Sequence, residues 1–212
     1  GVYSWNKAED AWSIQRRSQS KSSGYDIATQ LCGGIINFTP TDHSLDQSTE
    51  VLSDLADSDL TDYVQVFVGG KGAPTKSIML DTLGWLKSND SSEQLESLNN
   101  KLINEFLNVL DGEEHAEVST LIGATADHRG FFENSPHFPE TLLEKLKSLP
   151  GFDKTFSFKT TGAGGEDAIL IVGKPDGRKE AFSTLAASGW LPLDAEFTQS
   201  GMEICWHGEE LN

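Results

Sequence analysis

The sequence predicts an α+β fold: a mainly antiparallel sheet with helices packed on one face. Apolar residues recur at spacings of three or four over residues 93–110 and 114–132, which is typical of amphipathic helices. Residues 63–68 and 168–172 are short runs rich in Val, Ile and Phe, which is typical of strands. Helical and strand segments in this combination define the α+β class.

The other expected elements follow from local signals along the chain. A helix over residues 5–17 is followed by a polar, serine-rich loop at 18–24. Further helices are expected at 26–31, near Leu52, after Pro74, at 139–149 and at 178–188. Further strands are expected at 35–38 and, near the end of the chain, around Glu196 and Glu203.

The charge of the chain excludes some classes of partner. Its 33 acidic and 16 basic residues give a net charge of -17, which repels nucleic-acid phosphates, so any anion site must be local. No apolar run reaches the ~20 residues of a membrane span. The five histidines show no metal-type spacing, so we expect no protein metal site. The two cysteines lie far apart in the sequence, which favours reduced thiols and a cytoplasmic protein. From the charge and from the apolar runs we expect no nucleic-acid partner and no membrane partner.

A glycine-rich loop is the first candidate for chemistry. Three glycines in four positions permit positive φ angles and a close backbone approach, so that successive N–H groups can bind an anion. A tight turn between two strands is the alternative interpretation of the same residues. The loop consists of Thr161, Gly162, Ala163, Gly164 and Gly165.

A second candidate segment places an acidic residue after a serine- and glycine-containing loop. Ser22, Ser23 and Gly24 precede Asp26, which could act as a general base or could simply cap a helix. Lys21, Arg17 and Arg16 lie just upstream. These cations could receive a phosphate, although solvated surface charge is the alternative.

Taken together, the two segments resemble kinases of the GHMP class, which includes galactokinase, homoserine kinase, mevalonate kinase and phosphomevalonate kinase. The resemblance covers residues 18–206, and its order and distances agree with the family. The residues that carry it are 23–28, the pair Gly33 and Gly34, the strand–turn–helix segment 68–76, and 159–167. The string Gly162–Gly165 followed by Asp167 is most similar to phosphomevalonate kinase within the class.

The resemblance implies a fold, a site and a reaction. Residues 1–40 would be a remnant of the N-terminal kinase domain and residues 41–212 the C-terminal domain. Asp26 would be catalytic, and Gly162, Ala163, Gly164 and Gly165 would bind phosphate or nucleotide. The implied cofactors are ATP and Mg2+, and the acceptor is a small phosphorylated metabolite. The implied substrate-binding residues are Ser22, Ser23, Gly24, Lys21, Arg17 and Thr161.

Two departures from the family pattern limit this reading. Glu166 stands where the family prefers glycine, and the family's phosphate loop, P-x-x-x-G-L-G-S-S-A-A, does not occur in these 212 residues. We therefore expect activity to require an N-terminal segment, either as a separate chain or missing here, and this chain alone to be inactive. A non-catalytic binding or regulatory module with the same C-terminal fold, and another GHMP kinase acting on mevalonate or a sugar, are the alternatives.

Overall fold

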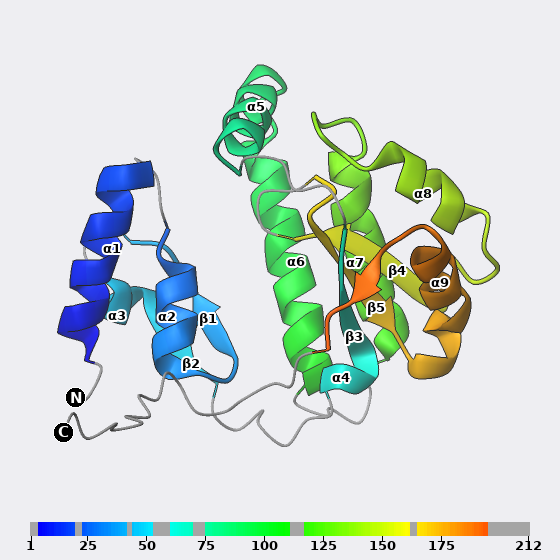
Figure 1. The fold of residues 1–212 in the computed structure, drawn as a ribbon, viewed down its shortest axis with the longest axis horizontal. Helices are drawn as coiled ribbons and strands as arrows, with labels where there is room; N and C mark the ends of the chain where they lie inside the picture. The colour runs from blue at the N-terminus through cyan, green and yellow to red at the C-terminus, as the bar shows by residue number, and fades with distance from the viewer. Residues whose placement is uncertain are drawn as a thin grey trace, which may run out of the picture. The chain divides into compact units, whose positions relative to one another are not determined.

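The computed structural model describes residues 4–19, 23–41, 44–52, 60–69, 75–110, 117–161 and 165–194. These residues fall into two compact units, one within residues 4–52 and the other within residues 60–194 (Figure 1). Each unit has its own buried core. The assignment of residues 1–40 and 41–212 to two kinase domains stays a prediction.

The first unit is a small helical layer with one strand pair. It contains α1 (Trp5–Gln19), α2 (Tyr25–Cys32), β1 (Ile36–Phe38), α3 (Leu45–Ser48) and β2 (Thr49–Val51). Strands β1 and β2 are antiparallel, with Ile36 opposite Val51, so this pair extends across residue 40. The core consists of Ala8, Trp12 and Leu45, with Trp5, Ile27, Leu31 and Phe38 packed against it.

Most local predictions for this unit are confirmed, but the helix expected near Leu52 is wrong. The helix α3 ends at Ser48, and the next three residues form β2 instead. Two of those three, Thr49 and Val51, are β-branched and fit the pleated surface that pairing with β1 provides.

The second unit is built on a four-stranded sheet. Its strands are β3 (Val64–Val68), β4 (Phe156–Thr160), β5 (Ala168–Gly173) and β6 (Leu191–Pro192), in the order β4-β5-β3-β6. Every neighbouring pair is antiparallel, as predicted. The helices are α4 (Leu60–Tyr63), α5 (Thr75–Ser88), α6 (Ser92–Leu110), α7 (Val118–Phe132), α8 (Glu140–Lys147) and α9 (Pro175–Ala187).

Helices cover both faces of this sheet, so the prediction of helices on one face is wrong. Phe156 and Phe158 pack in one core with residues of α8 and α9. Ser157 lies between them, is also fully buried, and bonds to Arg129 of α7. Because successive side chains of a strand point to opposite faces, α7 must cover the face opposite α8 and α9 (Figure 1). The uninterrupted apolar run of β5 is typical of a strand covered on both sides.

Two further predictions concern the end of the chain and membrane-spanning helices. The strands expected around Glu196 and Glu203 lie outside the described residues. Among the helices that are described, none has the length and apolar character needed to cross a membrane.

Candidate functional site

The glycine-rich loop connects two neighbouring strands of the second unit. Strand β4 ends at Thr160 and β5 begins at Ala168, and the backbone N–H and the hydroxyl of Thr161 both donate to the Ala168 carbonyl, each at 3.2 Å. Gly162, Ala163 and Gly164 lie outside the described residues. Gly165 is buried with φ of +86°, a left-handed conformation that favours glycine.

A cavity of about 390 Å3 lies beside the end of this loop, entirely within the second unit. Gly165 forms part of its wall, with residues of α5, α6, α7 and the end of β4. Its apolar lining residues are Met79, Leu83, Leu86, Leu95, Phe132, Pro136 and Phe138, and its polar ones are Thr82, Asn99, His128, Ser135, Lys159 and Thr160. None of the described residues that line this cavity is a carboxylate, although the chain has about twice as many acidic as basic residues.

Lys159 and His128 are the titratable groups of the cavity wall. Burial lowers the pKa of Lys159, whose Nζ donates to the Thr160 carbonyl at 2.9 Å. Burial, and secondarily the charge of Lys159, lowers the pKa of His128 to about 4. His128 is therefore neutral at physiological pH. Its Nε2 lies 3.1 Å from Asn99 Oδ1, which fits an Nε2–H donor.

Glu166, the departure from the family pattern, does not line this cavity. Its side chain is exposed and lines a second cavity of about 410 Å3, together with Lys145, Ser188 and Trp190. Glu166 would therefore not repel an anion in the first cavity as a carboxylate of its wall would.

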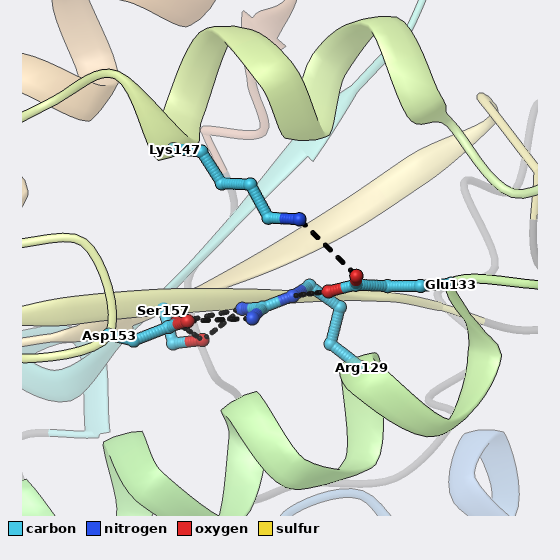
Figure 2. Close-up of polar contacts among 5 residues, drawn as sticks. All are labelled: Arg129, Glu133, Lys147, Asp153 and Ser157. Atoms are coloured by element: carbon cyan, nitrogen blue, oxygen red, sulfur yellow. Dashed lines mark hydrogen bonds and ion pairs between the residues drawn. The ribbon is translucent and has the colours of Figure 1, made fainter.

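A separate polar cluster fastens α7 to the start of β4 (Figure 2). Arg129 is 5% exposed and donates to both carboxylate oxygens of Asp153, at 2.8 and 2.7 Å, and to Ser157 Oγ at 2.8 Å. Its Nε also donates to Glu133 at 3.2 Å, and Lys147 approaches the same carboxylate at 3.3 Å. Although burial opposes it, bonding to Asp153 and Glu133 raises the pKa of Arg129 overall. Every cation here has its acid, so the cluster is structural.

The second candidate segment lies in the first unit, at the start of α2. Gly24 is the residue before the helix, with φ of +83°, and a methyl group there would lie 2.9 Å from the Trp12 ring. Asp26 follows in the first turn, and its Oδ2 accepts from Gln15 Nε2 at 2.9 Å. The N-cap residue of this helix is Gly24, which has no side chain to cap it. The interpretation of Asp26 as a helix cap is therefore wrong, and its half-buried carboxylate lies beside α1 instead.

The predicted substrate residues are placed only in part. Ser23 is exposed beside Gly24, and Arg17 is exposed in the last turn of α1, while Lys21 and Ser22 lie outside the described residues. Arg16 lies over the Trp12 ring at 4.7 Å. Within the described segments no group of three His, Cys, Asp or Glu side chains could hold a metal ion.

The structure thus brings Thr161 and Gly165 to one loop, and Gly24 and Asp26 to one helix start. Whether these two places meet stays a prediction. Sequence reasoning missed Lys159, His128 and Asn99. A signal existed for Lys159, because it directly precedes the glycine-rich loop in a chain poor in cations.

The comparisons with known proteins address the fold. No known protein-family model and no curated protein matches the chain. Among solved structures, the Lin0012 protein from Listeria innocua matches 88% of this chain and 57% of its own, with a TM-score of 0.66 and 15% identity. Mevalonate kinase from L. major, solved with R-mevalonate, matches 79% of this chain and 49% of its own, with a TM-score of 0.50 and 15% identity. A candidate sugar kinase from Campylobacter jejuni matches 92% and 52%, with a TM-score of 0.49 and 15% identity.

The likeness to mevalonate kinase from L. major shows a mixed α and β fold, in agreement with the α+β class that the sequence predicts. At 15% identity the likeness concerns the fold and not the reaction. The chain spans about half the length of the solved structures that it matches. Membership of the GHMP class and the narrower likeness to phosphomevalonate kinase therefore stay predictions.

Proposed function

We propose that this chain is the C-terminal portion of an ATP-dependent phosphotransferase of the GHMP class. Its acceptor is a small phosphorylated metabolite, as in phosphomevalonate kinases. The observation that carries the proposal is the position of the glycine-rich loop. It joins the adjacent strands β4 and β5 and ends, at Gly165, on the wall of a cavity whose described lining residues include no carboxylate.

The chain's own groups would act by positioning and by neutralising charge. Asp26 orients or deprotonates the attacking oxygen of the acceptor, while backbone N–H groups of residues 162–165 hold phosphate oxygens. The conformation of Gly165 fits this role, because a glycine at φ of +86° brings the backbone close to a ligand without a side chain in between. ATP would supply the phosphoryl group, and Mg2+ bound with the nucleotide would neutralise part of its charge.

The acceptor would be held by the segment before Asp26 and by the loop. Arg17 and Lys21 offer positive charge to a phosphorylated acceptor, and Ser22, Ser23, Gly24 and Thr161 offer hydroxyl and backbone groups. The proposed site is completed by an N-terminal segment that carries the phosphate loop, as a separate chain or as part of the same polypeptide.

An ADP-release assay on the chain assembled with that segment tests the proposal. Phosphomevalonate, mevalonate and galactose are compared as acceptors, and we expect turnover with phosphomevalonate. Asp26→Asn should lower kcat by roughly 100-fold or more, because it removes the general base. The matched control Asp10→Asn changes an exposed carboxylate on α1 and should leave kcat unaltered. Absence of ADP release with every acceptor would refute the kinase proposal.

The second candidate is a non-catalytic binding module with the same fold. Glu166, in place of the family's glycine, favours it. The two candidates differ in one measurable respect: the module binds a ligand without consuming ATP. Turnover that depends on Asp26 would exclude the module.

A further inference from the structure

The cavity beside the glycine-rich loop has no negatively charged side chain among its described lining residues, although the protein is acidic. Of the lining residues that the structure describes, Lys159 alone is charged at neutral pH, because His128 is neutral there. Removing an ammonium group from water is costly unless a counter-charge replaces the lost hydration. The described residues provide no ion pair for Lys159; its hydrogen bond goes to the neutral carbonyl of Thr160.

The neighbouring cation shows what a pairing would look like. Arg129, next to His128 on α7, has two carboxylates and a hydroxyl within 3.2 Å. Ser157, which Arg129 contacts, and Lys159 lie on the same face of β4, because they are two residues apart. Described acids thus pair with a cation near the start of β4, whereas none of them lines the cavity at the end of this strand.

The lining residues of the cavity also limit the chemistry and the size of the rest of the ligand. Leu83, Leu86 and Phe138 form part of an apolar wall, while the hydroxyls of Thr82 and Ser135 and the amide of Asn99 can bond to polar substituents. A volume of about 390 Å3 suits a small metabolite rather than a polymer.

We infer that this cavity binds the anionic group of a small aliphatic metabolite, with Lys159 as its counter-cation and as a specificity-determining residue. The inference rests on the proposed function for the identity of the ligand, which would be the acceptor, but on the cavity alone for the charge of the ligand. A phosphoryl group and a carboxylate share the required chemistry.

Calorimetric titration of the 212-residue chain with 5-phosphomevalonate and with mevalonate tests the inference, since the chain contains the whole described wall of the cavity. Lys159→Met keeps the length of the aliphatic stem and removes the charge. We expect it to weaken binding by at least 10-fold. The matched control Lys154→Met removes an exposed charge that precedes β4 and should change affinity by less than 2-fold. Weakening confined to 5-phosphomevalonate would assign Lys159 to the phosphoryl group. Equal weakening of both ligands would assign it to the carboxylate.

The kinase assay separates this inference from the proposed function. In the assembled enzyme, Lys159→Met should raise KM for the acceptor by the same factor and leave kcat nearly unchanged, which loss of structure alone would not do. Active enzyme whose Lys159→Met variant keeps its KM would overturn the inference and spare the kinase. Lysine-dependent binding without any turnover would overturn the kinase and spare the inference. No binding of either ligand to the chain would overturn the inference.

Discussion

Two cations at the junction of α7 and β4 are held in opposite ways. Arg129 meets Asp153 with two parallel hydrogen bonds at 2.8 and 2.7 Å and shares Glu133 with Lys147. Lys159 lies two residues beyond Ser157 on β4, and its cavity has no acid among the described lining residues. Arg129 therefore has its counter-charges within the fold, whereas no described acid lies beside Lys159 in its cavity.

The difference shows in the pKa of each group and in the use each can have. Burial acts against both charges, but the acids around Arg129 outweigh it and raise the pKa of Arg129, whereas the pKa of Lys159 is lowered. A paired buried cation fixes structure, and an unpaired one lowers stability unless a ligand completes it. Comparing the two positions by mutation separates a structural role from a binding role.

The largest expected effect follows from removing Arg129. Arg129→Met leaves Asp153 and Glu133 without their shared partner beside the apolar rings of Phe152 and Phe158. Breaking a buried ion pair in this way costs about 3–5 kcal/mol, measured as the free energy of unfolding in urea. Lys101→Met is the control, since its pair with Asp127 at 2.7 Å is half exposed and should cost no more than about 1 kcal/mol. Equal losses in both variants would contradict a structural role for the Arg129 cluster.

A smaller effect is expected from the titration of His128. The pKa of its folded state is about 4, below the 6.5 of an ordinary histidine, so the unfolded chain binds a proton at a pH where the folded chain does not. His128 stays neutral in the folded state until the pH approaches 4. Stability should therefore fall as the pH drops from about 6.5 to 4, by at most roughly 3 kcal/mol.

Urea unfolding of the wild type and of His128→Gln at several pH values measures this loss. The glutamine variant cannot titrate, so its pH dependence should be flatter between pH 6.5 and 4. Parallel curves for the two proteins would show that His128 is not held neutral. The cavity would then gain a second positive charge below a pH of about 6.5.

Gly165 offers a third test at the wall of the cavity. Gly165→Ala strains a backbone at φ of +86° and places a methyl group 3.1 Å from Ile78 Cδ1. Gly189→Ala meets the same strain at φ of +84°, but with no atom within 4 Å. Backbone strain alone should lower the free energy of unfolding by about 1–2 kcal/mol, so Gly165→Ala should lower it by that amount and by a few tenths of a kcal/mol more. Combining it with Ile78→Val, which deletes the contacting methyl, should recover the excess; an unchanged difference would assign it to another contact.

How far the sequence could predict this molecule depends on the range of the interactions involved. The helix α6 and the strand β3 were predictable because their signal is local, in the spacing of apolar residues and in β-branched content. The covering of the sheet on both faces was not predicted. It depends on α7 meeting residues such as Ser157 that are 28 positions or more away in the chain.

The candidate site divides in the same way. The glycine-rich loop was predictable from composition, and its position between β4 and β5 is confirmed. The cavity next to it was not, because Asn99, His128 and Lys159 come from three separate elements that only folding brings together. The role of Asp26 as a helix cap failed for a related reason, since Gln15 of the preceding helix engages its carboxylate.

The smallest expected effect completes the comparison of the two cations. Because the pKa of Lys159 is lower in the folded than in the unfolded chain, the charged side chain lowers stability at neutral pH. Lys159→Met should therefore leave the free energy of unfolding within about 1 kcal/mol of the wild type, or raise it. Arg129→Met should instead cause a clear loss of stability, although both variants remove a cation from the same junction. A loss as large as that of Arg129→Met would mean that Lys159 is structural, because a loss of that size is expected only when a cation with an acid partner in the fold is removed.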